Sequence, residues 1–192
     1  MMRSTLSLLI SLSFSLLLLH GTTATPTPSP SPILRPKTDL IKETCKTSAK
    51  ADSNIAYKFC VTSLQVVPKS HTTNLQGLGL ITTMLIKNNL THTHSRIRNL
   101  LKKPKFSKDM RSCLKVCLEC YDEAIYTIKE VNSAIMGKRY NDANNGATTV
   151  MTLATTCEDV FSEVEMKSLF TKNNDDVFQL VEMDFQIINM LR

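Results

Sequence analysis

The most regular pattern in the chain is a series of apolar residues spaced alternately four and three positions apart. The series comprises Met110, Leu114, Cys117, Tyr121, Ala124, Ile128, Val131 and Ile135. This spacing places every member on one stripe of an α-helix, and such a stripe is typical of the seam along which helices pack in a bundle. We therefore predict a long helix whose stripe faces a shared core.

Three further segments show helical periodicity, and strict apolar–polar alternation typical of strands is absent. One helix is expected over 73–103, with apolar positions at Leu75, Leu78, Ile81, Leu85, Ile97, Leu100 and Leu101. Another is expected over 140–167, with Ala147, Val150, Ala154, Cys157, Phe161 and Val164. The last should begin near 173–176, where Asn and Asp suit a helix N-terminus, and it carries Val177, Leu180, Val181, Ile188 and Leu191. Within the first segment, residues 91–95 are polar on all sides, which predicts a bend or a solvent-exposed stretch.

Two short helices should precede these four. Thr38 can cap a helix that includes Cys45, and residues 51–54 then form a turn. A second short helix includes Cys60 and stops at Pro68, because proline cannot continue a helix. A disulfide between the two cysteines would staple the helices into a hairpin, and closing a loop of this size stabilises by roughly 3 kcal/mol.

A second disulfide can join two of the long helices. Cys117 and Cys157 both fall on predicted seams, so antiparallel packing can bring them face to face. We therefore expect an all-α fold, an up-down four-helix bundle with a disulfide-stapled N-terminal helical hairpin.

The N-terminus predicts export to an oxidising compartment, where disulfides form. Residues 1–24 read as a signal peptide with Arg3 at its start, an apolar run over 6–19 and small residues at 22–24. The apolar run is too short for a confident membrane span. Residues 25–36, TPTPSPSPILRP, predict an extended linker, either a plain spacer or a segment for O-glycosylation. The folded domain should span 37–192, in a protein secreted to the apoplast or, alternatively, sent to the vacuole.

Composition narrows the class of partner. The hydrophobic content of 42% supports a real core, and the formal net charge is +6. Acidic residues are mixed in among the basic ones and no basic tail occurs, and the aromatic content is only 6% with no Trp. We therefore expect no nucleic-acid partner and, once the signal is removed, no membrane partner. A mildly basic secreted protein suits an acidic protein or an anionic wall polymer.

No arrangement of residues predicts catalysis. The sequence has no Gly-rich phosphate loop, nucleophile elbow or paired-His motif, so we expect no catalytic residue and no cofactor. Cys113, Cys117 and Cys120 lie within two helical turns, but a metal site would need a fourth ligand and a reducing compartment. Cys113 and Cys120 are seven apart, too far to bridge each other within a helix. They are expected to be buried thiols, with pairing to a second chain as the alternative.

Other polar residues receive simpler interpretations. His92 and His94 are two positions apart, which places them on different faces of a helix, and we interpret them as a solvated pair. His71 lies in an expected loop without an evident partner. Asn89-Leu90-Thr91 is an N-glycosylation sequon, which makes Asn89 a candidate glycan site.

Several of these motifs together resemble the plant invertase and pectin methylesterase inhibitor family. They are Asn54-Ile-Ala-Tyr-Lys-Phe-Cys60, Pro68-Lys-Ser-His-Thr-Thr-Asn-Leu-Gln-Gly-Leu-Gly-Leu80, Cys117-Leu-Glu-Cys-Tyr121 with Ala124, and Thr156-Cys-Glu-Asp-Val-Phe161. The resemblance covers about 37–192 and is strongest for the invertase-inhibitor branch that includes pollen allergens. It implies the pairs Cys45–Cys60 and Cys117–Cys157. Cys113 and Cys120 depart from the family's four-cysteine pattern.

The resemblance also implies a function and a site. Members are non-catalytic inhibitors of acid invertase or pectin methylesterase, and the invertase type inserts a Pro-Lys-Phe turn into the enzyme's cleft. Pro104-Lys105-Phe106 has the same three residues but precedes the third family cysteine, whereas the family motif lies between the third and the fourth. The matching position is Lys138-Arg139-Tyr140, which has lost Pro but keeps a cation before an aromatic residue.

We therefore expect a secreted, monomeric inhibitor that occludes the active-site cleft of a plant enzyme, with acid invertase as the first target. Pectin methylesterase is the alternative target, reached through the helix surfaces of the bundle. A different class of function, a bundle that binds a small apolar ligand, would require a cavity between the helices.

Overall fold

The structure, a computed structural model, describes residues 39–192. The predictions for the signal peptide, the linker, Lys37 and the Thr38 cap lie outside this range. The elements are α1 (Leu40–Ala51), α2 (Tyr57–Gln65), the 3-10 helix η1 (Pro68–His71), α3 (Leu75–Leu101), α4 (Lys108–Met136), α5 (Tyr140–Ser162) and α6 (Thr171–Leu191). No strand occurs between residues 39 and 192.

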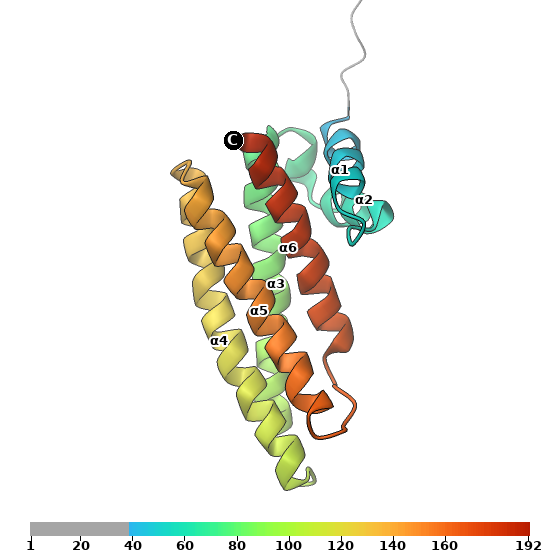
Figure 1. Cartoon of the computed structure of the whole chain (residues 1–192), viewed down its shortest axis with the longest axis vertical. Helices are drawn as coiled ribbons and strands as arrows, with labels where there is room; N and C mark the ends of the chain where they lie inside the picture. The colour runs from blue at the N-terminus through green and yellow to red at the C-terminus, as the bar shows by residue number, and fades with distance from the viewer. Residues whose placement is uncertain (1–38) are drawn as a thin grey trace, which may run out of the picture. The chain divides into compact units, whose positions relative to one another are not determined.

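The four long helices form the predicted up-down bundle (Figure 1). Each packs on two neighbours, in the pairs α3–α4, α4–α5, α5–α6 and α3–α6, so the ring is closed. The loops between α3 and α4 and between α4 and α5 therefore lie at opposite ends of the bundle. No helix in the described part of the chain is long and apolar enough to cross a membrane.

The seam predicted for α4 lies in the core. Its members from Leu114 to Ile135 are buried, and Met110 at the first turn is half-buried. In the polar stretch 91–95, Thr91, His92 and Ser95 are exposed as predicted, but the buried stripe of α3 continues through it at Thr93. Thr93 is completely buried because Leu90 and Ile97, three positions before and four after it, lie on the same face.

A buried polar layer crosses the bundle at this level. The Tyr121 hydroxyl donates to Oδ1 of Asn174 (2.6 Å), and Nδ2 of Asn174 donates to Oε2 of Glu158 (2.7 Å). Burial raises the pKa of the Tyr121 phenol, which a hydrogen bond with Thr93 partly opposes. The phenol thus stays protonated as a donor, and each of the four long helices contributes one residue to the layer.

The N-terminal hairpin forms as predicted. Oδ1 of Asp39 accepts from the backbone N–H of Lys42 (3.4 Å), so Asp39 caps α1. The Cys45–Cys60 disulfide joins α1 to α2. The hairpin contacts α6, where the N–H of Ala56 donates to Oε1 of Gln179 (3.3 Å).

Two helix ends differ from the periodicity-based prediction. α5 ends at Ser162 rather than near 167, and Val164 is 43% exposed instead of lying on the apolar stripe. Glu165 has a φ of 53°, a left-handed conformation that a helix cannot accommodate. α6 begins slightly early, after Phe170, whose buried ring packs 6.2 Å from that of Phe161.

Candidate functional site

The loop between α4 and α5 is a tight turn that exposes its cationic side chains. Gly137 ends α4, and the N–H of Arg139 donates back to the carbonyl of Ala134 (2.8 Å). Lys138 adopts a φ of 55°, which is unusual for a residue with a Cβ. Lys138 and Arg139 are exposed, whereas Tyr140 is half-buried against the core. The cation therefore projects outwards, next to an anchored aromatic ring.

Arg139 has a partner that we did not predict. Its Nη1 donates to Oδ2 of Asp142 at 2.7 Å, and both side chains are more than half exposed, at 59% and 57%. An exposed pair of this kind contributes about 0–1 kcal/mol. Asp142 is therefore a weak partner that the carboxylate of another protein can replace. The spacing of three within the first turn of α5 was visible in the sequence, and it could have indicated the pair.

A groove of about 790 Å³ lies beside the turn, between α4 and α5. Arg139 and Asp142 line it together with Tyr126, Thr127, Lys129, Glu130, Val131, Ser133, Ala134, Asn145, Gly146 and Thr149. The side chain of Tyr126 is 63% exposed and forms part of its wall. The turn and the groove together form a continuous surface that combines charge with one exposed ring.

Pro104-Lys105-Phe106 lies in the other loop, between α3 and α4. The 29 residues of α4 separate the two loops by about 43 Å at 1.5 Å per residue. Lys105 is exposed, and Phe106 is half-buried against the core. The two candidate tripeptides therefore cannot contribute to one compact site.

Both predicted disulfides are present, and the second, Cys117–Cys157, clamps α4 to α5. Cys113 and Cys120 are free and buried. Burial raises the pKa of both thiols, and nearby carboxylates act in the same direction. The Cys113 thiol donates to the carbonyl of Val160 (3.2 Å). These features describe unreactive thiols. Within residues 39–192, no cluster of three or more possible metal ligands occurs.

The histidines are less isolated than their sequence neighbourhood indicated. Nε2 of His94 lies 2.9 Å from Oδ1 of Asp122, with the His94 side chain only 16% exposed, so our interpretation of a solvated pair was wrong for His94. Asp122 belongs to α4 and comes close only when the bundle packs. His92 is exposed. Nε2 of His71 contacts the carbonyl of Gln65 at 3.0 Å, so this histidine does have a partner.

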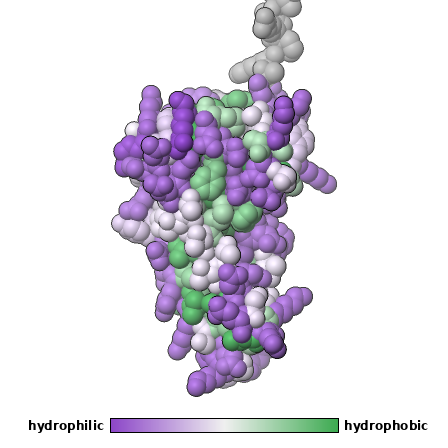
Figure 2. Space-filling model, viewed as in Figure 1, coloured by the Kyte–Doolittle hydropathy of each residue, from purple (hydrophilic) through white to green (hydrophobic). Residues whose placement is uncertain are grey.

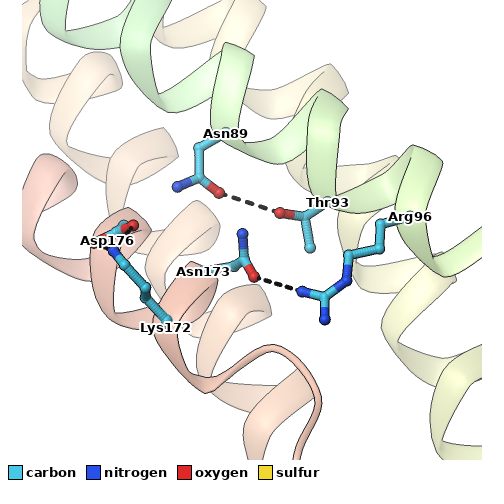
Figure 3. Close-up of polar contacts among 6 residues, drawn as sticks. All are labelled: Asn89, Thr93, Arg96, Lys172, Asn173 and Asp176. Atoms are coloured by element: carbon cyan, nitrogen blue, oxygen red, sulfur yellow. Dashed lines mark hydrogen bonds and ion pairs between the residues drawn. The ribbon is translucent and has the colours of Figure 1, made fainter.

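Asn89 lies on α3 where this helix faces the start of α6 (Figure 3). Its side chain is half-buried and Oδ1 accepts from the Thr93 hydroxyl (3.3 Å). Nearby, Arg96 donates to Oδ1 of Asn173 (3.2 Å), as the same figure shows. Glycan attachment at Asn89 stays a prediction.

Comparisons with known proteins agree with this architecture. The family described as plant invertase/pectin methylesterase inhibitor matches residues 39–186. The chain is 34% identical over 154 residues to a protein of Platanus acerifolia named "Putative invertase inhibitor", covering 80% of this chain and 86% of that one. It is 27% identical to "Pectinesterase inhibitor 12" of Arabidopsis thaliana, over 79% of this chain and 87% of that one.

A solved structure shares the fold. The crystal structure of a mutant form of a pectin methylesterase inhibitor from Arabidopsis superposes with a TM-score of 0.67 and 18% identity, over 81% of this chain and 99% of the other. Proteins of this family are inhibitors, which act by binding rather than by catalysis. The match to most of the chain, together with the two disulfides and the closed bundle, shows that the chain belongs to the plant invertase/pectin methylesterase inhibitor family.

Proposed function

We propose that this protein inhibits an acid invertase by inserting the α4–α5 turn into the active-site cleft of the enzyme. The observation that carries the proposal is the exposed Arg139 beside the anchored ring of Tyr140. A glycosidase cleft contains a pair of carboxylates, and a guanidinium can bind one of them through two parallel hydrogen bonds. The adjacent ring then packs against the cleft wall.

The rigidity of the turn favours tight binding. The Cys117–Cys157 disulfide joins the two helices that carry the turn, and the backbone bond from Arg139 to Ala134 closes it. A rigid loop loses little conformational entropy on binding, so more of the interaction free energy appears as affinity. Breaking the ion pair between Arg139 and Asp142 costs little free energy, because both side chains are exposed.

Pectin methylesterase is the second candidate target, because one relative is named as a pectinesterase inhibitor. In this case the helix faces rather than the turn would contact the enzyme. The α4–α5 groove with the exposed Tyr126 offers such a face.

We further propose that the protein acts as a monomer after export to the apoplast, with the vacuole as the alternative destination. The bundle that binds an apolar ligand stays a third hypothesis, which titration with a fluorescent lipid probe would test.

The decisive experiment titrates oxidised, signal-free protein against an acid invertase and a pectin methylesterase at acidic pH. We expect stoichiometric loss of invertase activity. Loss of pectin methylesterase activity alone would replace the first target with the second, and loss of neither would contradict both.

A double substitution then tests the turn itself. We expect Arg139→Ala with Tyr140→Ala to abolish invertase inhibition while the helical circular dichroism is unchanged. The matched control is Lys105→Ala with Phe106→Ala, which removes the same types of side chain from the opposite end of the bundle. Inhibition that survives in the Arg139/Tyr140 variant would exclude the turn as the inhibitory site.

A further inference from the structure

The positive charge of the protein is concentrated in one short segment. Residues 96–111 contain seven Lys and Arg residues and a single carboxylate, Asp109, which gives a formal charge of +6. The whole chain also has a formal charge of +6, so all other residues together are neutral. The charges are therefore less evenly mixed along the chain than we predicted from the sequence.

The fold places this segment at the tip of the bundle. It comprises the last turns of α3, the connecting loop and the first turn of α4. We call the exposed cations of this segment the basic tip: Arg96, Arg98, Lys102, Lys103, Lys105 and Lys108. In Figure 2, hydrophilic side chains predominate at this lower end of the molecule, with small hydrophobic areas between them. The seventh cation, Arg111, is half-buried.

The cations of the basic tip are not neutralised by the protein. The four ion pairs found among residues 39–192 lie elsewhere. Arg96 donates to an amide oxygen, that of Asn173, and its guanidinium lies 5.2 Å from the centre of the Phe170 ring. Neither contact removes the charge. Each cation therefore remains available to an anion from outside.

The backbone that carries these charges is held in place. Nη1 of Arg111 donates to the carbonyl of Leu101 (2.9 Å), and Nη2 donates to that of Lys103 (2.6 Å). Ser107 caps α4 by accepting from the N–H of Met110 (3.2 Å). The loop thus presents its lysines from a fixed backbone, while the lysine side chains themselves stay free to adjust.

A shallow groove leads away from the tip along α3. It has a volume of about 580 Å³ and is lined by His92, Ser95, Arg96, Asn99, Leu100 and Lys103. These residues recur at helical spacing, so hydroxyl, amide and cationic groups alternate along one face. A groove of this composition suits an extended ligand that carries both hydroxyl groups and negative charges.

We propose that the basic tip binds a linear anionic polysaccharide, a polyuronate with free carboxylates. Several separate lysines match a polymer with one charge per sugar, because an ammonium is a point charge without a preferred plane. Single-stranded nucleic acid needs aromatic platforms for its bases, and the only aromatic residue of the 96–111 segment, Phe106, is half-buried. Residues 1–24 predict export, and export to the apoplast rather than the vacuole would bring the protein to such polymers.

This second surface is independent of the inhibitory turn. The length of α4, about 43 Å, separates the two, so an enzyme at one end leaves the other end accessible. Binding of the basic tip to the polymer would then retain the protein in the cell wall and leave the proposed inhibitory turn accessible. The proposal does not depend on which enzyme is the target.

The test compares binding of the oxidised protein to polygalacturonate and to fully methyl-esterified pectin, which lacks the charges. The variant carries Lys102→Gln, Lys103→Gln, Lys105→Gln and Lys108→Gln. The matched control carries Lys46→Gln, Lys50→Gln, Lys58→Gln and Lys69→Gln, four exposed lysines of the hairpin region with the same change in net charge. We expect the tip variant to bind polygalacturonate about tenfold or more weakly and the control less than about twofold, because interactions between exposed charges fall off within a Debye length.

Three results would overturn the proposal. The first is equal weakening in the two variants, which would show that only net charge matters. The second is equal binding of the esterified polymer by the unmodified protein. The third is tighter binding to single-stranded DNA or to phosphatidylserine vesicles than to polygalacturonate, which would identify another class of partner. Thermal unfolding of both variants checks that each is folded.

Discussion

The buried polar layer gives a structural role to residues of two family motifs, Cys117-Leu-Glu-Cys-Tyr121 and Thr156-Cys-Glu-Asp-Val-Phe161. Tyr121 follows the third family cysteine by four positions, and Glu158 follows the fourth directly. Their shared partner is Asn174, which is 5% exposed and satisfied on both its oxygen and its nitrogen. A buried amide with both groups paired fixes the positions of the helices that contact it, because any shift leaves a polar atom unpaired.

We predict that Tyr121→Phe lowers the free energy of unfolding by about 1–3 kcal/mol, since the substitution leaves the Asn174 oxygen buried without its donor. Urea denaturation followed by circular dichroism measures the change. Tyr126→Phe is the control, because its side chain is 63% exposed and should alter stability by less than about 0.5 kcal/mol. Equal stability of the two variants would mean that the Tyr121–Asn174 hydrogen bond contributes nothing measurable.

At the scale of elements, the pairing of α4 with α5 depends on a close approach at Gly146. A Cβ added to this residue would lie 2.7 Å from Cγ2 of Val131, a branched and fully buried side chain. Such a contact requires a shift, because Val has few rotamers available in a helix. The apolar spacing predicted the two helices, but not that their approach at this point leaves no room for a side chain at position 146.

We predict that Gly146→Ala destabilises the domain by up to about 2 kcal/mol, because an overpacking cost of about 1–3 kcal/mol outweighs the gain in helix propensity of about 1 kcal/mol. Thermal unfolding compared with that of Asn145→Ala provides the measurement, since Asn145 is the exposed neighbour on the same helix. A rise in melting temperature for Gly146→Ala would show that α4 and α5 separate readily at this point.

For the molecule as a whole, the sequence was sufficient to predict what depends on periodicity and cysteine placement. The bundle, the hairpin and both disulfides follow from those features. Contacts between distant residues could not be predicted, because Asp122 reaches His94 and Asn174 reaches Tyr121 only after packing. The turn Lys138–Tyr140 was located through family resemblance. The cations of residues 96–111 can be counted in the sequence, but their exposure at one tip of the bundle became evident only on the fold.

Two carboxyl groups on α6 link the stability of the whole domain to pH. Asp184 is completely buried, and neither of its oxygens has a hydrogen-bond partner among the described residues. Burial raises the pKa of Asp184 well above its usual value. Glu182 is half-buried, and its pKa is raised to about 7, first by burial and then by the carboxyl group of Asp52 at the end of α1. Both acids are therefore protonated more readily in the folded state than in the unfolded chain.

The direction of the pH effect follows from these shifts. An acid with a raised pKa in the folded state contributes its full stability below its unfolded pKa, near 3.8 for Asp184 and 4.5 for Glu182. This stability is lost as the pH rises through the folded pKa, which is about 7 for Glu182. We therefore predict a higher urea midpoint at pH 5 than at pH 8.

Asp184→Asn isolates the contribution of the buried carboxyl group, because the amide cannot ionise. We expect this variant to lose most of the difference between the urea midpoints at pH 5 and pH 8, and Asp142→Asn, an exposed substitution, to keep it. An unchanged pH dependence in Asp184→Asn would assign the effect to Glu182 and Asp52, where α6 meets the end of α1. In either case, we expect acid pH to stabilise the folded domain through carboxyl groups that belong neither to the Lys138–Tyr140 turn nor to the basic tip.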